Sequence, residues 1–448
     1  MFMNEQTPDP QGILTRRSFL KSSSAAVAGA AFANLSIERM AHAASSDELK
    51  IALVGCGGRG TGAADQALNT HKLGPVKLVA MADAFEDRLK GALGGLKAKH
   101  GDRVDVPADR QFIGFDGYKK AISLADVVIL ATPPGFRPMQ FEEAVKQGKH
   151  VFTEKPVATD APGVRKFLAA AEESKKKGLK VGVGLQRHHQ IGYLETIKRI
   201  QDGMIGDITA QRVYWNGNTP WVQERAKLEK QHGRKLTEME YQMRNWYYFV
   251  WLCGDHINEQ HIHNLDVGNW VKGKYPVRAN GMGGVQVRKG KDYGEIFDHH
   301  AVEYVYDDES RMYSQCRHIV GCWNSVSEHA HGTKGQANIS SYQITAGADR
   351  WRHRGQDDPD PYQVEHDGLF AAIRGNKEFN EAHNGAMSTM TAILGRMCTY
   401  SGKEISMEDA LKSEVNYFPD KLSWDATPKS LPGPDGMYEI PMPGITKV

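Results

Sequence analysis

Short apolar runs alternate with stretches of helical periodicity through the first half of the chain, beginning at residue 49. The runs of strand length lie at residues 49–54, 76–82, 125–131 and 150–153, and helical stretches lie between them at 61–67 and 138–148. Strands that alternate with helices predict parallel pairing through helical crossovers, which gives an α/β fold with a doubly wound parallel sheet. Ligands bind such a sheet beyond the carboxyl ends of its strands, so the residues that follow each run are candidate site residues.

A glycine fingerprint directly follows the first apolar run. Gly55-Cys56-Gly57-Gly58-Arg59-Gly60 has the spacing G-x-G-x-x-G between a strand and a helix. The first glycine permits a tight turn, the second lets the backbone approach a pyrophosphate, and the third lets the helix pack closely on the strand. We therefore predict that a dinucleotide binds at Gly55, Gly57, Gly58, Arg59 and Gly60.

Asp83 ends the second apolar run, roughly 20 residues beyond Gly60. A carboxylate at this place can accept hydrogen bonds from the adenosine ribose diol and would repel a 2′-phosphate. The residue favours NAD as the cofactor, with NADP as the alternative. Four more residues follow the third and fourth runs and are also predicted to contact the cofactor: Thr132, Pro133, Glu154 and Lys155.

The first 43 residues have the pattern of a twin-arginine signal peptide. Arg16 and Arg17 precede a run of small apolar residues at 25–35, and Ala41-His42-Ala43 supplies an A-x-A cleavage site. We therefore predict a signal peptide over residues 1–43, export by the twin-arginine machinery, and a periplasmic or otherwise exported protein. Because little free nucleotide is present beyond the inner membrane, an exported nucleotide-dependent enzyme needs a tightly bound cofactor.

Composition and charge narrow the function classes. The 448 residues carry 56 Lys and Arg against 54 Asp and Glu, a net charge of +2, which gives no field to hold nucleic acid or an anionic membrane. No uninterrupted apolar run reaches about 18 residues, so we do not expect an integral membrane protein. The five cysteines form no C-x-x-C pair, and at most one disulfide is expected, Cys316 to Cys322.

Taken together, these residues resemble the glucose–fructose oxidoreductase / inositol dehydrogenase family (Gfo/Idh/MocA), from about residue 49 to about residue 412. The resemblance is carried by the segments 54–60, 131–133, 148–156 and 332–335. The third of these ends in Glu154-Lys155-Pro156, a specific signal when it follows a strand of this fold. Homo-oligomers are common in the family, so we expect one here.

The resemblance also implies the domain organisation. It predicts an NAD-binding Rossmann domain over residues 49–165 and a substrate-binding α/β domain over residues 166–415, whose open, mostly antiparallel sheet covers the nicotinamide. Strand-like and helical segments in the second domain agree with this, at 208–215, 281–287, 301–306, 311–318, 361–374 and 386–400. The proline-rich residues 416–448 indicate an extended tail.

The family places the lysine of Glu-Lys-Pro beside the substrate and the nicotinamide ribose, which implies a catalytic role for Lys155. The aspartate and histidine that the family usually carries correspond to Glu259 and His263, and the longer glutamate is a departure. On a helix these two residues are i and i+4 and share a face. A histidine with a pKa near neutrality, oriented by a carboxylate, suits deprotonation of a hydroxyl during hydride transfer.

Three further residues are predicted to bind substrate. His256 lies one helical turn from Glu259, Asn264 adjoins His263, and Arg187 matches a family arginine. The histidines and carboxylates of this stretch could also bind a divalent metal. Helical histidine clusters more often form hydrogen-bond networks, and no H-E-x-x-H is present, so we predict no metal.

Three functions are compatible with these residues. The first is an NAD(P)-dependent oxidoreductase that moves hydride between the bound cofactor and a secondary hydroxyl of a sugar or polyol. The second is a redox-neutral glycoside hydrolase or lyase, in which transient oxidation acidifies a neighbouring C–H and a glycosidic group is eliminated. The third is a non-catalytic binding module, which the presence of both Lys155 and His263 disfavours. Trp215, Trp221 and Trp246 could stack on a sugar or belong to the core.

Overall fold

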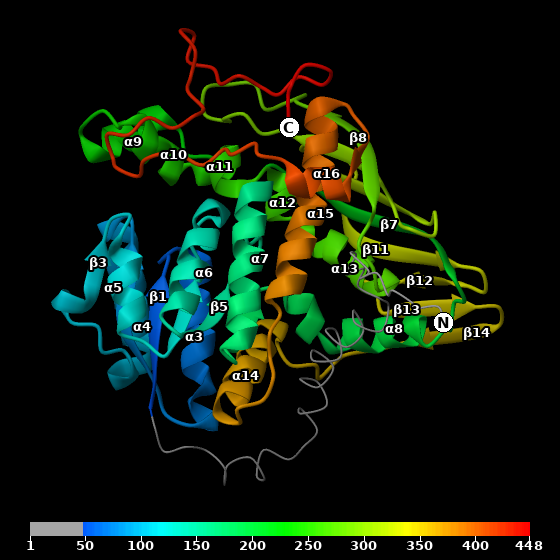
Figure 1. The fold of residues 1–448 in the computed structure, drawn as a ribbon, viewed down its shortest axis with the longest axis horizontal. Coiled ribbons are helices and arrows are strands. Elements are labelled where there is room, and N and C mark those ends of the chain that lie inside the picture. Colours follow the sequence, from blue (N-terminus) through cyan, green and yellow to red (C-terminus); the bar gives the residue numbers. More distant parts are fainter. Residues whose placement is uncertain (1–47) are drawn as a thin grey trace, which may run out of the picture.

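The computed structural model describes residues 48–448 (Figure 1). The predicted signal peptide, residues 1–43, lies outside the described residues. Two sheets organise the described part of the chain, sheet A in its amino-terminal part and sheet B in the remainder, and helices pack on both. None of the helices in residues 48–448 is both long enough and apolar enough to cross a membrane.

Sheet A has six parallel strands in the order β3-β2-β1-β4-β5-β6. They are β1 (Leu49–Val54), β2 (Val76–Asp83), β3 (Gln111–Ile113), β4 (Val127–Leu130), β5 (His150–Thr153) and β6 (Val181–Val183). This topology confirms the predicted doubly wound parallel sheet. The sheet extends past residue 165, the expected end of this domain, because a strand of only 3 residues gives little signal in the sequence.

Helices cover both faces of sheet A. The face that carries Ile51 and Leu53 is covered by α3 (Gly58–Asn69), α4 (Glu86–His100) and α14 (Pro361–Arg374). The face that carries Ala52 and Val54 is covered by α5 (Gly117–Ser123), α6 (Arg137–Lys146) and α7 (Ala161–Lys176). Successive residues of a strand therefore point to two covered faces, which explains why the strands are apolar throughout.

Sheet B has nine strands in the order β14-β13-β12-β11-β7-β10-β9-β8-β15. They are β7 (Ile208–Gly217), β8 (Arg278–Gly284), β9 (His299–Val305), β10 (Arg311–His318), β11 (Ser325–Gly332), β12 (Gln336–Asn338), β13 (Gln343–Ala346), β14 (Asp349–Arg352) and β15 (Ile405–Ser406). Among these pairs only β7 with β10 is parallel. The mostly antiparallel second sheet confirms the expected fold class.

The remaining helices pack on sheet B or link it to the first domain. The longer ones are α8 (Ile191–Gln201), α13 (Ile262–Lys272) and α15 (Ala382–Ser401), and the shorter ones are α9 (Arg225–His232), α10 (Glu238–Arg244), α11 (Val250–Cys253), α12 (His256–Glu259) and α16 (Met407–Lys412). Residues 413–448 contain no helix or strand and pass along α10 and α11 (Figure 1). All five cysteines are free, so the bridge that the sequence allowed between Cys316 and Cys322 does not form.

Candidate active site

A cleft of about 710 Å³ lies beyond the carboxyl ends of the strands of sheet A, and residues of both domains line it. Every residue predicted to bind the cofactor belongs to this lining: Gly55, Gly57, Gly58, Arg59, Gly60, Asp83, Thr132, Pro133, Glu154 and Lys155. Glu259 and His263, from the second domain, line it as well. The cleft therefore brings the predicted nucleotide-binding and catalytic residues together.

The glycine loop, residues 55–60, has the geometry that a bound dinucleotide needs. Gly55 has a φ of +93°, and a Cβ there would lie 2.5 Å from the Thr132 nitrogen. A Cβ on Gly60 would lie 1.9 Å from the Gly55 oxygen, so α3 packs this closely on β1 only without a side chain there. A Cβ on Gly57 or Gly58 would meet nothing within 4 Å, so their backbone faces the open cleft at the start of α3. The loop thus fits a pyrophosphate, whose charge a helix N-terminus stabilises.

Asp83 ends β2 beside the glycine loop. Its Oδ2 accepts a hydrogen bond from the Cys56 nitrogen at 2.6 Å, and its Oδ1 accepts one from the Phe85 nitrogen at 2.8 Å. Burial raises the pKa of this carboxyl, and the two backbone donors oppose that rise. The carboxylate therefore fixes the loop to the strand end and still lines the cleft, where its remaining lone pairs can accept from a ribose diol.

Arg59 forms two ion pairs at the start of α3. It pairs with Glu154, the residue before Lys155, and its Nη2 lies 3.2 Å from Glu365 Oε1 on α14. Its guanidinium also lies 4.9 Å from the ring centre of Tyr362. Because both carboxylates are buried, they depend on this guanidinium to offset their charge. The glycine loop is thereby tied to a helix from the carboxyl-terminal part of the chain.

Lys155, Glu259 and His263 meet in one part of the lining, which we call the histidine wall. Lys155 Nζ donates to the backbone oxygen of Glu259 at 2.8 Å and lies 3.4 Å from its Oε1. Glu259 Oε2 and His263 Nδ1 are buried without a hydrogen-bond partner among the described residues. The His263 ring stacks on Trp215 with 6.1 Å between ring centres. An ammonium, a carboxylate and an imidazole therefore stand together beside the cleft.

The surroundings set the protonation of the histidine wall. Burial lowers the pKa of the His263 imidazole well below its usual range, and the charges of Lys155 and Arg187 act in the same direction. Burial raises the pKa of the Glu259 carboxyl, and the charges of Lys155 and Arg137 oppose that rise. His263 is therefore neutral near pH 7, the form that can accept a proton. Its pKa is lower than the near-neutral value expected from the sequence, because the ring is more buried than a sequence pattern can indicate.

The helix expected to carry both Glu259 and His263 is interrupted between them. α12 ends at Glu259 and α13 begins at Ile262. Both side chains still line the cleft, whereas His256 is fully buried outside the lining, with its Nδ1 at 2.8 Å from Asp255 Oδ1. A buried carboxylate thus holds the His256 ring inside the protein, and its predicted contact with substrate stays a prediction.

Arg187 and Asn264 also lie outside the cleft lining. Both bind the same acid, Glu328 on β11: Arg187 forms an ion pair with it, and the Asn264 amide donates to its Oε1. Glu328 is fully buried, so its charge requires these donors. Both side chains therefore compensate a buried charge, and their predicted contact with substrate stays a prediction. The neighbouring Gln186 lines the cleft instead.

Several lining residues were not predicted, and they come from the residues that follow β2, from residues 223–244 and from the link between α12 and α13. They are Phe85, Arg88, Gln223, Met243, Arg244 and Gln260. Arg244 lies over the Phe85 ring at 4.0 Å and 3.3 Å from Asp87, so α10 is held against the end of β2. Only the tryptophans of this region gave a usable signal in the sequence, and Trp215, Trp221 and Trp246 do line the cleft.

Aromatic residues of the carboxyl-terminal tail pack against phenylalanines that line the cleft. Trp424 lies 5.1 Å from Phe85 and 4.6 Å from Phe115 between ring centres, and Phe418 lies 5.4 Å from Phe136. These three phenylalanines line the cleft, whereas the two tail residues do not. The tail therefore packs against the aromatic part of the wall near Asp83 and holds it in place.

Comparison with known proteins agrees with this geometry. A family model described as "Oxidoreductase family, NAD-binding Rossmann fold" matches residues 49–184. The inositol 2-dehydrogenase of Rhizobium meliloti (strain 1021) is 24% identical over 264 residues, which cover 58% of this chain and 66% of that protein. This match thus spans slightly less than two thirds of that relative.

Two further similarities extend the comparison. A glycosyl hydrolase family 109 protein of Shewanella baltica (strain OS195) is 25% identical over 213 residues, which cover 43% of this chain and 44% of that protein. A solved structure of scyllo-inositol dehydrogenase from Lactobacillus casei, with bound NAD(H) and scyllo-inositol, aligns with a TM-score of 0.58 and 19% identity. That alignment covers 81% of this chain and 100% of the other. At this low sequence identity it shows that the two folds are similar and nothing more.

Proposed function

The chain belongs, through residues 49–184, to the Gfo/Idh/MocA oxidoreductase family, and on this premise we propose that it transfers hydride between a bound NAD(P) and a secondary hydroxyl of a sugar or polyol. The observation that carries the proposal is the position of the histidine wall. Lys155, Glu259 and His263 line the same cleft as the glycine loop, so a nucleotide and a substrate hydroxyl can lie side by side there.

Each residue of the histidine wall has a defined part in this reaction. When bound, the nicotinamide accepts or donates the hydride. Lys155 binds the substrate hydroxyl, and its ammonium lowers the cost of the developing alkoxide charge. His263 Nδ1 is buried, so its Nε2 is the nitrogen that faces the cleft, and the neutral ring accepts the hydroxyl proton there. Glu259 keeps one oxygen near Lys155 and has a second oxygen for another substrate hydroxyl.

The aromatic part of the cleft supports a carbohydrate or polyol as the substrate. Trp215, Trp221 and Trp246 present flat faces that can pack on the C–H surface of a ring. Gln223 and Gln260 add side-chain amides, which can both donate and accept hydrogen bonds. Stacking surfaces combined with amides and charged groups suit a ligand with many hydroxyls.

Nucleotide release and a substrate panel test the proposal. Acid treatment of the purified full-length protein should release close to one nucleotide per chain, and chromatography then identifies it as NAD, which Asp83 favours, or as NADP. Sugars and polyols are next added to the untreated protein, and reduction of the nucleotide is followed at the NADH absorbance. A protein that holds no nucleotide and binds no added NAD(H) or NADP(H) would refute the proposal.

A second candidate is redox-neutral glycoside cleavage, with which the similarity to the glycosyl hydrolase family 109 protein is compatible. A ring carbon would lose hydride to bound NAD⁺, a base would remove the acidified neighbouring proton, and the glycosidic group would leave with a proton. Water would then add to the double bond and the hydride would return to the carbonyl carbon, so no net NADH forms. Release of free sugar from an aryl glycoside without net NADH would select this candidate over the first.

We propose in addition that the protein is exported by the twin-arginine pathway with its nucleotide bound. The support is the pattern around Arg16 and Arg17, together with a cleft whose wall is backed by the tail. Replacing both arginines by lysine should shift the protein from the periplasmic to the cytoplasmic fraction of the cell. An unchanged distribution would contradict export by this pathway.

A further inference from the structure

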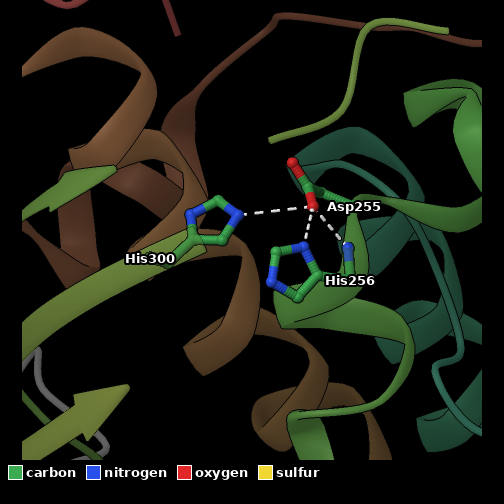
Figure 2. Close-up of side chains that lie close together, drawn as sticks. All are labelled: Asp255, His256 and His300. Carbon is green, nitrogen blue, oxygen red and sulfur yellow. Dashed lines mark hydrogen bonds and ion pairs between the residues drawn. The ribbon is translucent and has the colours of Figure 1, made fainter. Parts of the chain in front are cut away.

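Three side chains of the kind that bind metals converge in the interior, outside the cleft lining. Asp255 precedes α12, His256 is the first residue of that helix, and His300 lies on β9 of sheet B. Asp255 Oδ1 lies 2.8 Å from His256 Nδ1 and 3.3 Å from His300 Nε2, and the three side chains are fully buried. Figure 2 shows both rings turned toward this one carboxylate oxygen, and the three donor atoms lie within 4.8 Å of one another.

A hydrogen bond orients the His300 ring and leaves its Nε2 facing the Asp255 carboxylate. The Thr399 hydroxyl donates to the Arg396 carbonyl at 3.0 Å, so it accepts from His300 Nδ1 at 2.9 Å. With its proton on Nδ1, a neutral His300 directs the lone pair of Nε2 toward the Asp255 carboxylate. This nitrogen has no hydrogen bond of good geometry among the described residues, although it lies 3.3 Å from the carboxylate oxygen. Two lone pairs that face each other in a dry interior need a cation between them, and either a proton on Nε2 or a metal ion supplies it.

The other contacts of Asp255 fix the orientation of its carboxylate. Its Oδ2 accepts from the Phe297 nitrogen at 2.9 Å and from the Tyr400 hydroxyl, while its Oδ1 accepts from the His256 backbone nitrogen and faces the two imidazoles. Asp255 also has a φ of +73°, a conformation that non-glycine residues adopt at a cost. The fold therefore accepts backbone strain to keep this carboxylate in place.

We propose that Asp255, His256 and His300 bind one divalent transition-metal ion, through Oδ1, Nδ1 and Nε2 respectively. Two imidazoles and one carboxylate suit Zn²⁺ and its first-row neighbours rather than Mg²⁺ or Ca²⁺. Ligand bonds of about 2.1 Å set tetrahedral ligand atoms roughly 3.4 Å apart, so the 2.8 Å edge has to widen and the 3.3 Å edge already fits. When His256 binds the ion, its proton moves from Nδ1 to Nε2, so the ring stays neutral, and Thr399 holds the His300 ring from its other nitrogen.

The ion would hold the short helix that ends in the histidine wall. α12 runs from His256 to Glu259, so a metal bond from its first residue to β9 fixes the helix that carries Glu259. The His256 ring also packs 4.5 Å from that of His318, which hydrogen-bonds at 2.7 Å to the cleft residue Gln260. The metal site is thus a positioning site behind the cleft and does not itself contact substrate.

Metal analysis of the unaltered protein is the first test, and it does not depend on the proposed reaction. The full-length protein, purified without chelators and with any affinity tag removed, is incubated with Zn²⁺ and desalted before elemental mass spectrometry. We expect close to one Zn²⁺ per chain, and visible absorption bands when Co²⁺ replaces it. Less than about 0.1 equivalent of either ion would overturn the proposal and leave a hydrogen-bond network only.

A matched pair of neighbouring histidines supplies the second test. His300→Gln should lower the Zn²⁺ content at least tenfold. His299→Gln should leave it unchanged, because His299 pairs with Asp298 instead and its side chain is 41% exposed. Neither residue lines the cleft, so the nucleotide content of both variants reports whether they are folded. Full metal content in a folded His300→Gln protein would exclude the site, and if this variant does not fold, the metal content of the unaltered protein decides.

Discussion

At the glycine loop the cleft is lined by backbone, and the position of Gly60 allows no side chain because a Cβ would lie 1.9 Å from the Gly55 oxygen. At the histidine wall the lining consists of side chains, and Lys155, Glu259 and His263 come from two different domains. The loop recognises a pyrophosphate, a group common to every dinucleotide, through main-chain donors. The histidine wall carries charged and titratable groups, and these assist catalysis only when a matching substrate lies against them.

This difference means that nucleotide binding and chemistry can be lost separately. A change in the glycine loop should empty the cleft while leaving the histidine wall intact. A change in the histidine wall should leave the nucleotide bound and stop turnover. Variants that fail to separate the two properties in this way would contradict the assignment of the two regions.

The largest effect is expected from His263→Ala. Without the imidazole the histidine wall loses the group assigned to accept the hydroxyl proton, so turnover should fall by roughly 10²-fold to 10⁴-fold. The nucleotide content should stay unchanged, because His263 is not part of the glycine loop. His232→Ala, at the exposed end of α9, serves as the control and should have normal turnover. Near-normal turnover of the His263 variant would remove this residue from the mechanism.

Gly60→Ala should empty the cleft. The added methyl group pushes α3 away from β1 at the place where the pyrophosphate binds, so the purified variant should retain less than about a tenth of the nucleotide. Gly91→Ala makes the same change within α4, where the added Cβ would have no other atom within 4 Å. The folded protein should therefore be unchanged in stability or more stable by about 0.5–1 kcal/mol. Acid release and thermal unfolding measure both variants. Full nucleotide content in Gly60→Ala would argue against this loop as the pyrophosphate site.

Trp424→Ala tests whether the tail helps to retain the nucleotide. It removes two aromatic contacts behind the cleft wall, each worth about 0.5–1.5 kcal/mol, so nucleotide release should become roughly tenfold faster. Stopped-flow fluorescence of bound NADH in the presence of excess NAD⁺ measures this rate. Trp323→Ala, whose side chain is exposed on the second domain, is the matched control and should release nucleotide at the normal rate. Equal rates in the two variants would show that the tail has no such role.

The smallest effect is expected from pH. Oxidation of a hydroxyl needs the neutral form of His263, and that form is lost as the pH falls through the pKa of the folded protein. Because burial places this pKa well below the usual histidine value of about 6.5, the rate should be constant from pH 7 to 8 and decline only at clearly acidic pH. A rate profile with a midpoint near pH 7 would show that the bound complex does not keep this histidine buried.

The glycine loop could be predicted from the sequence because its signal is local. A strand, three spaced glycines and the acid at the end of the next strand all lie within residues 49–83, and backbone conformation determines their arrangement. The residues after β4 and β5 followed from the rule that parallel strands place their carboxyl ends at one edge. Lys155 and His263 depended on the family resemblance, and the structure places both in the cleft.

The predicted residues that lie outside the cleft lining have partners far away in the sequence. His256 belongs to a cluster completed by His300, and Arg187 and Asn264 are bound by Glu328. A helical pattern over residues 254–266 gives no sign of the break between α12 and α13, which turns neighbouring histidines in different directions. Burial and charge pairing between distant strands decide such cases, and a single sequence does not contain them.

The position of Trp424 has a consequence for the order of events in the cell. A chain is synthesised from its amino terminus, and domains generally fold in that order. The Rossmann sheet can therefore form well before Trp424, which packs against the cleft wall, has been translated. A nascent protein would therefore pass through a stage in which the coenzyme can enter and leave freely. Only the finished polypeptide could hold it, which would make stable loading a late step of biogenesis.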